Sequence, residues 1–104
     1  MEFKYINLDY LIEVSDNDAS FIRDILSLFA EEAPKAARQM QSNMDDNSKS
    51  VQIGQIAHKL KPSAAYIGNH ELHSLLEQLQ LLKDEHKLDQ EAKEKIKRSV
   101  LLIN

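Results

Sequence analysis

The sequence of 104 residues has no cysteine and no tryptophan, only two glycines and two prolines, and an aromatic fraction of 6%. Without cysteine the chain has no disulfide, no thiolate metal site and no cysteine nucleophile. No apolar run approaches the roughly 20 residues of a membrane span, and the first residues lack the apolar stretch of a signal peptide. We therefore expect a cytoplasmic protein.

An excess of positive charge is also missing. The chain carries 13 Lys and Arg against 17 Asp and Glu, which gives a formal net charge of -4. Nucleic-acid binding depends on a basic surface that neutralises phosphates, and anionic membranes attract the same kind of surface. The charge balance therefore argues against nucleic acid and against membrane as partners.

Residues that favour helices dominate the chain, and no segment alternates between apolar and polar side chains as a half-buried strand would. There is no internal repeat, no low-complexity segment and no linker in the middle of the sequence. The length suits one hydrophobic core. We therefore predict an all-α protein with a single domain over residues 1–104.

Capping residues and apolar periodicity predict two helices in the first half. A short helix capped by Asn7 runs through Val14, before the polar run 15–18. A long second helix follows, and Pro34 is expected to kink it or to mark a restart. Its apolar face is predicted to consist of Phe21, Ile22, Ile25, Leu28 and Phe29, continued less strongly by Ala33, Ala36, Ala37, Met40 and Met44.

Three more helices are predicted after the polar run 45–48. The third spans about 49–66 and ends at Gly68, a left-handed stop, and Asn69 caps the fourth. The fifth spans about 89–103. Four long helices with short connections predict an antiparallel up-down four-helix bundle, with the short N-terminal helix as a lid over one end. The inner stripes are predicted to be Leu72, Leu75, Leu76, Leu79, Leu82 and Lys83 in the fourth helix, and Ala92, Ile96, Val100 and Ile103 in the fifth.

His58 is the residue of the third helix that points to a function. On a helical wheel, at about 100° per residue, it falls outside the apolar arc of that helix. A glycine inside a helix costs roughly 1 kcal/mol relative to alanine and an interior proline roughly 3 kcal/mol, so Gly54 and Pro62 are poor choices for stability alone. Since the neighbours are mostly small, the imidazole is expected to stand clear. Those neighbours are Gly54, Lys61, Pro62 and Ala65.

Gln80 is predicted to reach His58. The histidine lies 10 residues before Gly68 and the glutamine 12 after it, so the two have nearly the same height on antiparallel helices. A glutamine there can hold one imidazole nitrogen and leave the other facing outward, which fixes the tautomer that a nucleophilic histidine requires. Lys61, one turn beyond His58, would place an ammonium near any anion built on the outer nitrogen.

These residues resemble the histidine-containing phosphotransfer (HPt) domain of bacterial and eukaryotic phosphorelays. The pattern of that family, Ala-His-x-Leu-Lys-Gly-Ser, reads here Ala-His-Lys-Leu-Lys-Pro-Ser over 57–63. A turn with Ile67-Gly68 and a leucine-rich helix with Leu72 and Leu76-Glu77 follow it. Upstream, residues 21–29 and Ala33-Pro34 look like the second helix of the family, so the resemblance covers nearly the whole chain.

The resemblance implies roles for individual residues. His58 is similar to the phosphorylated histidine, Lys61 to the lysine that assists the phosphoryl group, and Gln80 to a polar residue that contacts the imidazole. Pro62 replaces the usual glycine and lacks the amide hydrogen that would bond the carbonyl of His58, so a local kink is expected. Gly54 is expected to support the site by its small size. The docking rim is expected to include Lys59, Ser63 and Ala65, with Ala64 and Ile67 near the contact.

The resemblance also implies a function. The chain would carry a phosphoryl group on His58 from an aspartate of one receiver domain to that of another. It would be a monomeric carrier without an ATP site or cofactor of its own, and not an enzyme, since Mg²⁺ and the acidic pocket belong to the receiver. A hybrid histidine kinase is a further candidate partner, and the initial Met1 favours a free-standing protein.

Two other readings of the sequence remain. A helical adaptor could keep this fold and bind signalling partners without transferring phosphate, if Pro62 spoils the site. His70, His73 and Glu77 share a helical stripe that could in principle bind a metal ion, although a solvated polar face explains them better. His86 has no partner at all, and no metal site is expected.

Overall fold

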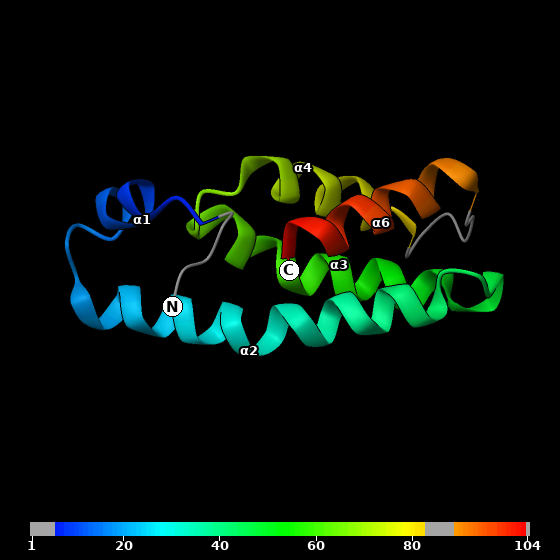
Figure 1. Cartoon of the computed structure of the whole chain (residues 1–104), viewed down its shortest axis with the longest axis horizontal. Helices are drawn as coiled ribbons and strands as arrows, with labels where there is room; N and C mark the ends of the chain where they lie inside the picture. The colour runs from blue at the N-terminus through cyan, green and yellow to red at the C-terminus, as the bar shows by residue number, and fades with distance from the viewer. Residues whose placement is uncertain (1–5, 83–88, 104) are drawn as a thin grey trace.

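A computed structural model describes residues 6–82 and 89–103, apart from the side chain of Asn47. That part of the chain is helical and contains no strand, which confirms the predicted all-α class. None of its helices is long and apolar enough to cross a membrane. The elements are α1 (Leu8–Val14), α2 (Ala19–Asn43), the 3-10 turn η1 (Asn47–Lys49), α3 (Ser50–Tyr66), α4 (His70–Leu79) and α6 (Gln90–Ile103) (Figure 1).

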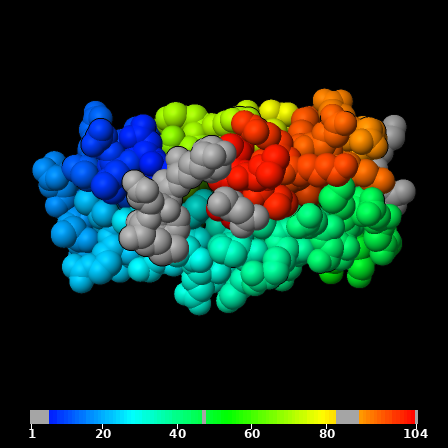
Figure 2. Space-filling view, in the orientation of Figure 1, coloured from blue at the N-terminus to red at the C-terminus, as the bar shows by residue number. Residues whose placement is uncertain are grey.

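The helices form an elongated bundle with dimensions of 42 × 24 × 18 Å. Helix α2, with 25 residues, spans most of the long axis, since its length is about 37 Å at 1.5 Å per residue. Helix α3 packs on α2, α4 packs on α3, and α6 closes the bundle against α2 and α4. Helix α1 lies at one end and contacts α3. Figure 2 shows α1 and α6 along the long side opposite α2. The predicted helical bundle with a short N-terminal helix is confirmed.

Side-chain caps begin three of these helices where the sequence predicts a start or a break. The Asn7 side chain accepts a hydrogen bond from the Tyr10 amide at 3.0 Å, and the Asp18 side chain accepts one from the Phe21 amide at 3.1 Å. Asn69 caps α4 in the same way. Between α1 and α2, Asp16 and Asn17 take left-handed backbone angles, with φ of 54° and 61°, which short polar side chains tolerate best. Local chemistry therefore sets these boundaries.

Both prolines lie inside uninterrupted helices. Pro34 is within α2 and Pro62 within α3. The restart considered for Pro34 is therefore wrong, because α2 continues through this residue. Pro62 is exposed, and its ring nitrogen has no hydrogen to donate to the carbonyl of His58, four residues before it.

The core is built mainly from the second half of α2, from α3, and from α4 and α6. The weaker part of the apolar face predicted for the second helix is buried throughout, namely Ala33, Ala36, Ala37, Met40 and Met44, whereas only Phe29 of the stronger part is buried. The prediction that Leu28 faces the core is wrong, because 46% of it is exposed. Leu28 lies about 100° round the helix from the buried Phe29, at the edge of the apolar face. Leu75, Val100 and Ile103 are only partly buried, and Lys83 lies outside the described residues.

The turn between α3 and α4 is packed against the N-terminal segment. Gly68 has φ of +75°, a conformation that L side chains rarely adopt. A Cβ added there would lie 2.8 Å from the Asn7 Cβ and 3.0 Å from the Tyr10 ring, so only glycine fits. The Asn7 amide donates to the Ile67 carbonyl at 2.8 Å. These contacts fix the point at which α3 turns into α4.

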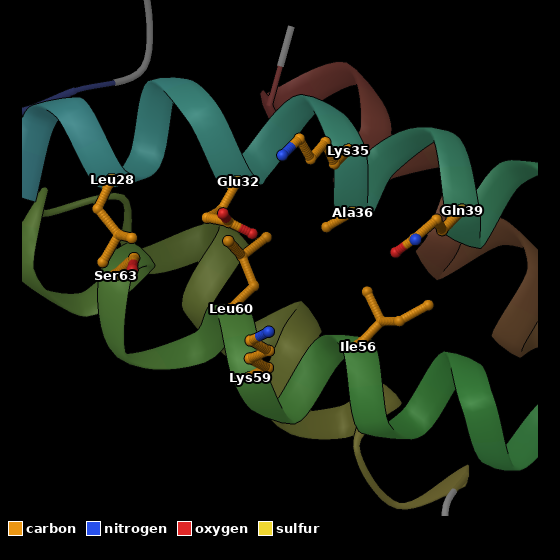
Figure 3. Close-up of a pocket in the computed structure, with 9 residues that line it drawn as sticks. All are labelled: Leu28, Glu32, Lys35, Ala36, Gln39, Ile56, Lys59, Leu60 and Ser63. Carbon is orange, nitrogen blue, oxygen red and sulfur yellow. The ribbon is translucent and has the colours of Figure 1, made fainter.

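A groove runs between α2 and α3. Its apolar floor and polar rim enclose a hollow of about 460 Å³, and the side chains of both helices project into it in Figure 3. Helix α2 contributes one stripe and α3 another, each spaced by three or four residues. The lining residues are Leu28, Glu32, Lys35, Ala36 and Gln39 from α2 and Ile56, Lys59, Leu60 and Ser63 from α3.

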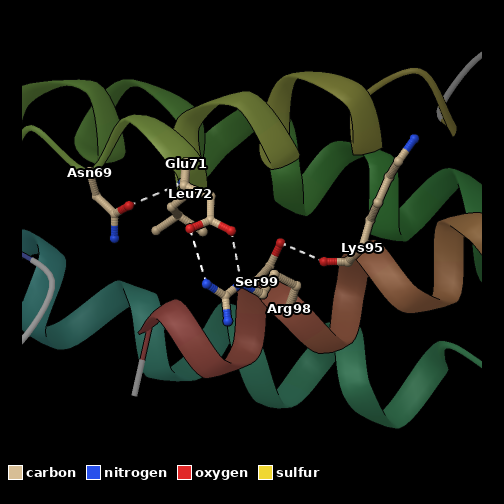
Figure 4. Close-up of polar contacts among 6 residues, drawn as sticks. All are labelled: Asn69, Glu71, Leu72, Lys95, Arg98 and Ser99. Carbon is tan, nitrogen blue, oxygen red and sulfur yellow. Dashed lines mark hydrogen bonds and ion pairs between the residues drawn. The ribbon is translucent and has the colours of Figure 1, made fainter.

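An ion pair ties α4 to α6 (Figure 4). The Arg98 guanidinium donates to both carboxylate oxygens of Glu71, at 2.8 and 3.1 Å. The hydrogen bond from Arg98 holds the pKa of the Glu71 carboxyl below its usual value. Because the pKa is lowered in the folded state, the contribution of this pair is present above the usual glutamate pKa and is lost as the pH falls below it. Both side chains are about half exposed, so the ion pair contributes little to the stability of the fold.

Replacing Pro62 with alanine is expected to raise the free energy of unfolding by about 1 to 3 kcal/mol. Alanine restores an amide that can donate to the His58 carbonyl, and the exposed position has little packing to lose. Chemical denaturation monitored by circular dichroism measures the change. Ser74→Ala, at an exposed position of α4, is a control without the backbone effect. A less stable Pro62→Ala protein would show that the ring favours this helix.

Candidate functional site

His58 stands on the exposed face of α3, eight residues before the end of that helix. Its Nδ1 lies 2.9 Å from the side-chain Oε1 of Gln80. The predicted approach of the glutamine to an exposed imidazole is thereby confirmed. Gln80 is the residue that follows the last turn of α4, and its amide still donates to the Leu76 carbonyl at 2.9 Å. The backbone of α4 thus holds the glutamine in place.

This hydrogen bond selects one form of the imidazole. The Oε1 atom of an amide only accepts, so Nδ1 must carry the hydrogen. In the neutral ring the other nitrogen, Nε2, then keeps its lone pair. Because His58 is exposed and Nδ1 is occupied by Gln80, Nε2 is the nitrogen left for an incoming reactant. The arrangement produces a nucleophile without a general base.

The charge around His58 is positive although the whole chain has a net charge of -4. Helix α3 carries Lys59 and Lys61 and no carboxylate, unlike every other α-helix that the structure describes. Neither lysine forms an ion pair with a described residue. Lys61 is half-buried one turn after His58, and Lys59 is exposed beside it. Both ammonium groups are therefore available to an anionic ligand or partner.

The placement of several predicted site residues needs correction. Gly54 is buried, so it does not form part of the open surface beside His58. Ser63 is only 8% exposed and lines the groove between α2 and α3. Ala64 and Ile67 are fully buried in the core, so they do not offer a docking surface. Neighbouring helices cover α3 on two flanks, and a helical wheel alone cannot tell how far each flank is covered. Ala65 is half-buried, whereas Lys59 and Pro62 are exposed as predicted.

Tyr66 belongs to this surface and was missed by the sequence analysis. It lies two turns after His58, is 43% exposed, and meets the ring of Phe21 edge to face at 5.3 Å between centroids. Together with Pro62 it continues the exposed strip of α3 that begins at His58. The spacing of four residues between His58, Pro62 and Tyr66 was the available signal.

The stripe of His70, His73 and Glu77 does not form a metal-binding cluster in the described part of the chain. Within residues 6–82 and 89–103 no three His, Asp or Glu side chains are close enough to hold an ion. His70 packs edge to face on Tyr10, with 5.2 Å between the ring centroids, and His73 is half-buried. His86 lies outside the described residues. The contact of His70 helps to seat α1 on the α3–α4 turn.

Replacing Gln80 with leucine is expected to let the His58 ring populate both tautomers. Without the acceptor, Nδ1 has no bound partner and the ring redistributes its hydrogen between the two nitrogens. The ¹⁵N chemical shifts of the ring measure this directly, and they should indicate a hydrogen on Nδ1 in the parent and a mixture in Gln80→Leu. Gln78→Leu, two residues earlier and exposed, is the matched control. Identical ring shifts in Gln80→Leu and the parent would contradict the assignment.

The sequence was compared with known families, curated proteins and solved structures. Residues 24–102 match the family model described as the Hpt domain. No curated protein and no solved structure matches the chain. The match covers most of the chain, from the first turns of α2 to the last turn of α6. It includes His58, Lys61 and Gln80. Hpt domains are phosphotransfer carriers in phosphorelays, have no ATP site and interact with receiver domains. The chain belongs to the Hpt domain family.

Proposed function

We propose that this chain accepts a phosphoryl group on Nε2 of His58 from the aspartyl phosphate of one receiver domain and passes it to the aspartate of another. The observation that carries the proposal is the exposed imidazole whose Nδ1 is held by Gln80 at 2.9 Å. We further propose that the whole chain, residues 1–104, acts as one monomeric unit and that a hybrid histidine kinase is among its upstream partners.

The transfer needs no proton to move. The lone pair of Nε2 attacks phosphorus, the N–P bond forms, and the P–O bond to the aspartate breaks with its electron pair left on the carboxylate. The imidazole keeps its hydrogen on Nδ1 and becomes positively charged. In the reverse direction the neutral ring leaves again, and the phosphoryl group joins the carboxylate of the next receiver. One site therefore serves both halves of the relay.

Gln80 is proposed to assist because its hydrogen bond strengthens during the reaction. As the N–P bond forms, positive charge spreads over the ring and makes Nδ1–H a better donor to Oε1. An interaction that is stronger in the transition state than in the ground state lowers the barrier. The same bond prevents the ring from rotating away from the direction of attack. Gln80 thus positions His58 and stabilises its charged form.

Lys61 is proposed to compensate the charge of the transferred phosphoryl group. It follows His58 by one turn, and the residues near it include no ion-pair partner within the described part of the chain. A half-buried ammonium exerts a stronger field than a fully solvated one, because less water screens it. Lys59 and Pro62 are proposed to border the docked receiver, which is expected to supply Mg²⁺ and its own acidic pocket.

The experiment that tests the proposal is incubation of the chain with radiolabelled, phosphorylated receiver domains. We expect label on the parent and none on His58→Gln, with His73→Gln as the control that keeps full labelling. The label should be stable in alkali and labile in acid, as an N–P bond is. A parent chain that binds receivers without taking up label would instead identify it as a helical adaptor.

Replacing Lys61 with alanine is expected to slow the labelling of His58 by roughly tenfold or more, because a charge-assisted interaction with the phosphoryl oxygens is lost. The fold should persist, since an exposed or half-exposed lysine contributes little to stability. Rapid-quench kinetics measure the rate and circular dichroism checks the fold. Lys97→Ala on α6 is the matched control. Equal rates for Lys61→Ala and the parent would remove Lys61 from the reaction.

A further inference from the structure

Helix α4 carries two carboxylates, which lie about 120° apart round the helix. Glu71 pairs with Arg98 of α6, as Figure 4 shows. Glu77 is exposed and forms no ion pair with a described residue. It also belongs to no metal-binding cluster in the described part of the chain. Its charge is therefore available to act on the groups around it.

Glu77 lies on the flank of α4 that faces α3. Gln80 marks that flank, because its Oε1 is 2.9 Å from Nδ1 of His58. Three residues turn a helix by about 300°, so Glu77 points within about 60° of Gln80. His73, half-buried four residues before Glu77, shares the flank. Of the two carboxylates of α4, Glu77 is thus the one on the side of His58.

Glu77 and Lys61 are at the same level along the bundle. The contact between His58 and Gln80 aligns α3 with α4, which run in opposite directions from the turn at Gly68. Lys61 is three residues nearer to that turn on α3, and Glu77 is three residues nearer to it on α4. Each is displaced by about 4.5 Å from the level of the imidazole. Two opposite charges therefore stand side by side, one turn from His58.

Phosphorylation of His58 makes the site more negative. The transferred phosphoryl group carries more negative charge than the positive charge that the ring gains, so the site gains one negative charge in total. Lys61 lowers the free energy of that form and Glu77 raises it. Because Lys61 is half-buried and Glu77 is exposed, water screens Glu77 more strongly. The attraction is thus the larger effect, and Glu77 reduces it.

We propose that Glu77 destabilises phosphorylated His58 by charge repulsion and thereby shifts the transfer equilibrium toward the aspartate of the receiver. This inference rests on the proposed function. In that step the N–P bond breaks with its electron pair left on Nε2, a carboxylate oxygen of the receiver bonds to phosphorus, and the hydrogen stays on Nδ1. Glu77 exchanges no proton and touches no reacting atom. The same charge opposes uptake from a receiver, so the carrier holds the phosphoryl group less tightly.

A series of charges at position 77 tests the proposal. Glu77→Asp, Glu77→Gln and Glu77→Lys are each mixed with the phosphorylated receiver domain that labels the parent fastest in a panel. The ratio of labelled chain to labelled receiver is measured at equilibrium and at an ionic strength of about 0.01 M, where screening is weak. Unit charges about 8 Å apart in water change an equilibrium constant roughly two- to threefold. We expect that increase for Glu77→Gln, about the same factor again for Glu77→Lys, and the parent ratio for Glu77→Asp.

Two controls separate a charge effect from a structural one. Glu94→Gln makes the same change in net charge at an exposed position of α6 and should keep the parent ratio. At about 1 M salt the Debye length falls to about 3 Å, so the ratios of the Glu77 variants should converge on that of the parent. A change in packing would persist in salt. Circular dichroism checks that each variant is folded.

The outcomes distinguish this inference from the proposed function. A parent that exchanges label with receivers, at a ratio that Glu77→Gln and Glu77→Lys leave unchanged, overturns the role of Glu77 alone. A shift in Glu94→Gln as large as that in Glu77→Gln overturns it too, because net charge would then explain both. A parent that no receiver of the panel labels refutes the proposed function, and the role of Glu77 with it.

Discussion

The register between α3 and α4 is the constraint on which the rest of the site depends. His58 and Gln80 are 22 residues apart in the chain, and each lies on a different helix. They meet because the turn at Gly68 starts α4 at one fixed point, with φ of +75° and no room for a Cβ beside Asn7 and Tyr10. A shift of one residue in either helix would turn one side chain by about 100° and break the contact. Asn7 and Tyr10 therefore help to fix the register on which the contact between His58 and Gln80 depends.

That constraint explains why a weak hydrogen bond is enough to select the tautomer of His58. A neutral bond at an exposed position contributes only about 0.5 to 1.5 kcal/mol, too little to hold two mobile elements together. The backbone bond from the Gln80 amide to the Leu76 carbonyl and the buried Leu76 and Leu79 hold the glutamine in place beforehand. The side-chain bond then only has to choose a tautomer. Preorganisation by the bundle takes the place of a strong local interaction.

The sequence could predict those features that depend on residue spacing along a helix or across a short turn. The caps at Asn7 and Asn69, the left-handed Gly68 and the matched height of His58 and Gln80 all follow from spacing along a helix or a turn. The burial of Gly54 and Ser63 and the exposure of Leu28 do not, because they depend on how closely two helices approach on each flank. The groove is missed for the same reason. Both helices line it, with the small Ala36 on α2 and the small Ser63 on α3, and such a combination has no signature in either helix alone.

The two lysines of α3 lie on different flanks of that helix. Lys59 and Lys61 are two residues apart, so they diverge by about 200° and flank His58 on opposite sides. On the α4 side lie Gln80, which contacts the ring at 2.9 Å, and Lys61, which we propose compensates the charge of the phosphoryl group. On the α2 side lie Lys59 and the hollow between α2 and α3 that Lys59 lines. Because the two flanks face different helices, substitutions on the α2 side can leave the contact between His58 and Gln80 intact.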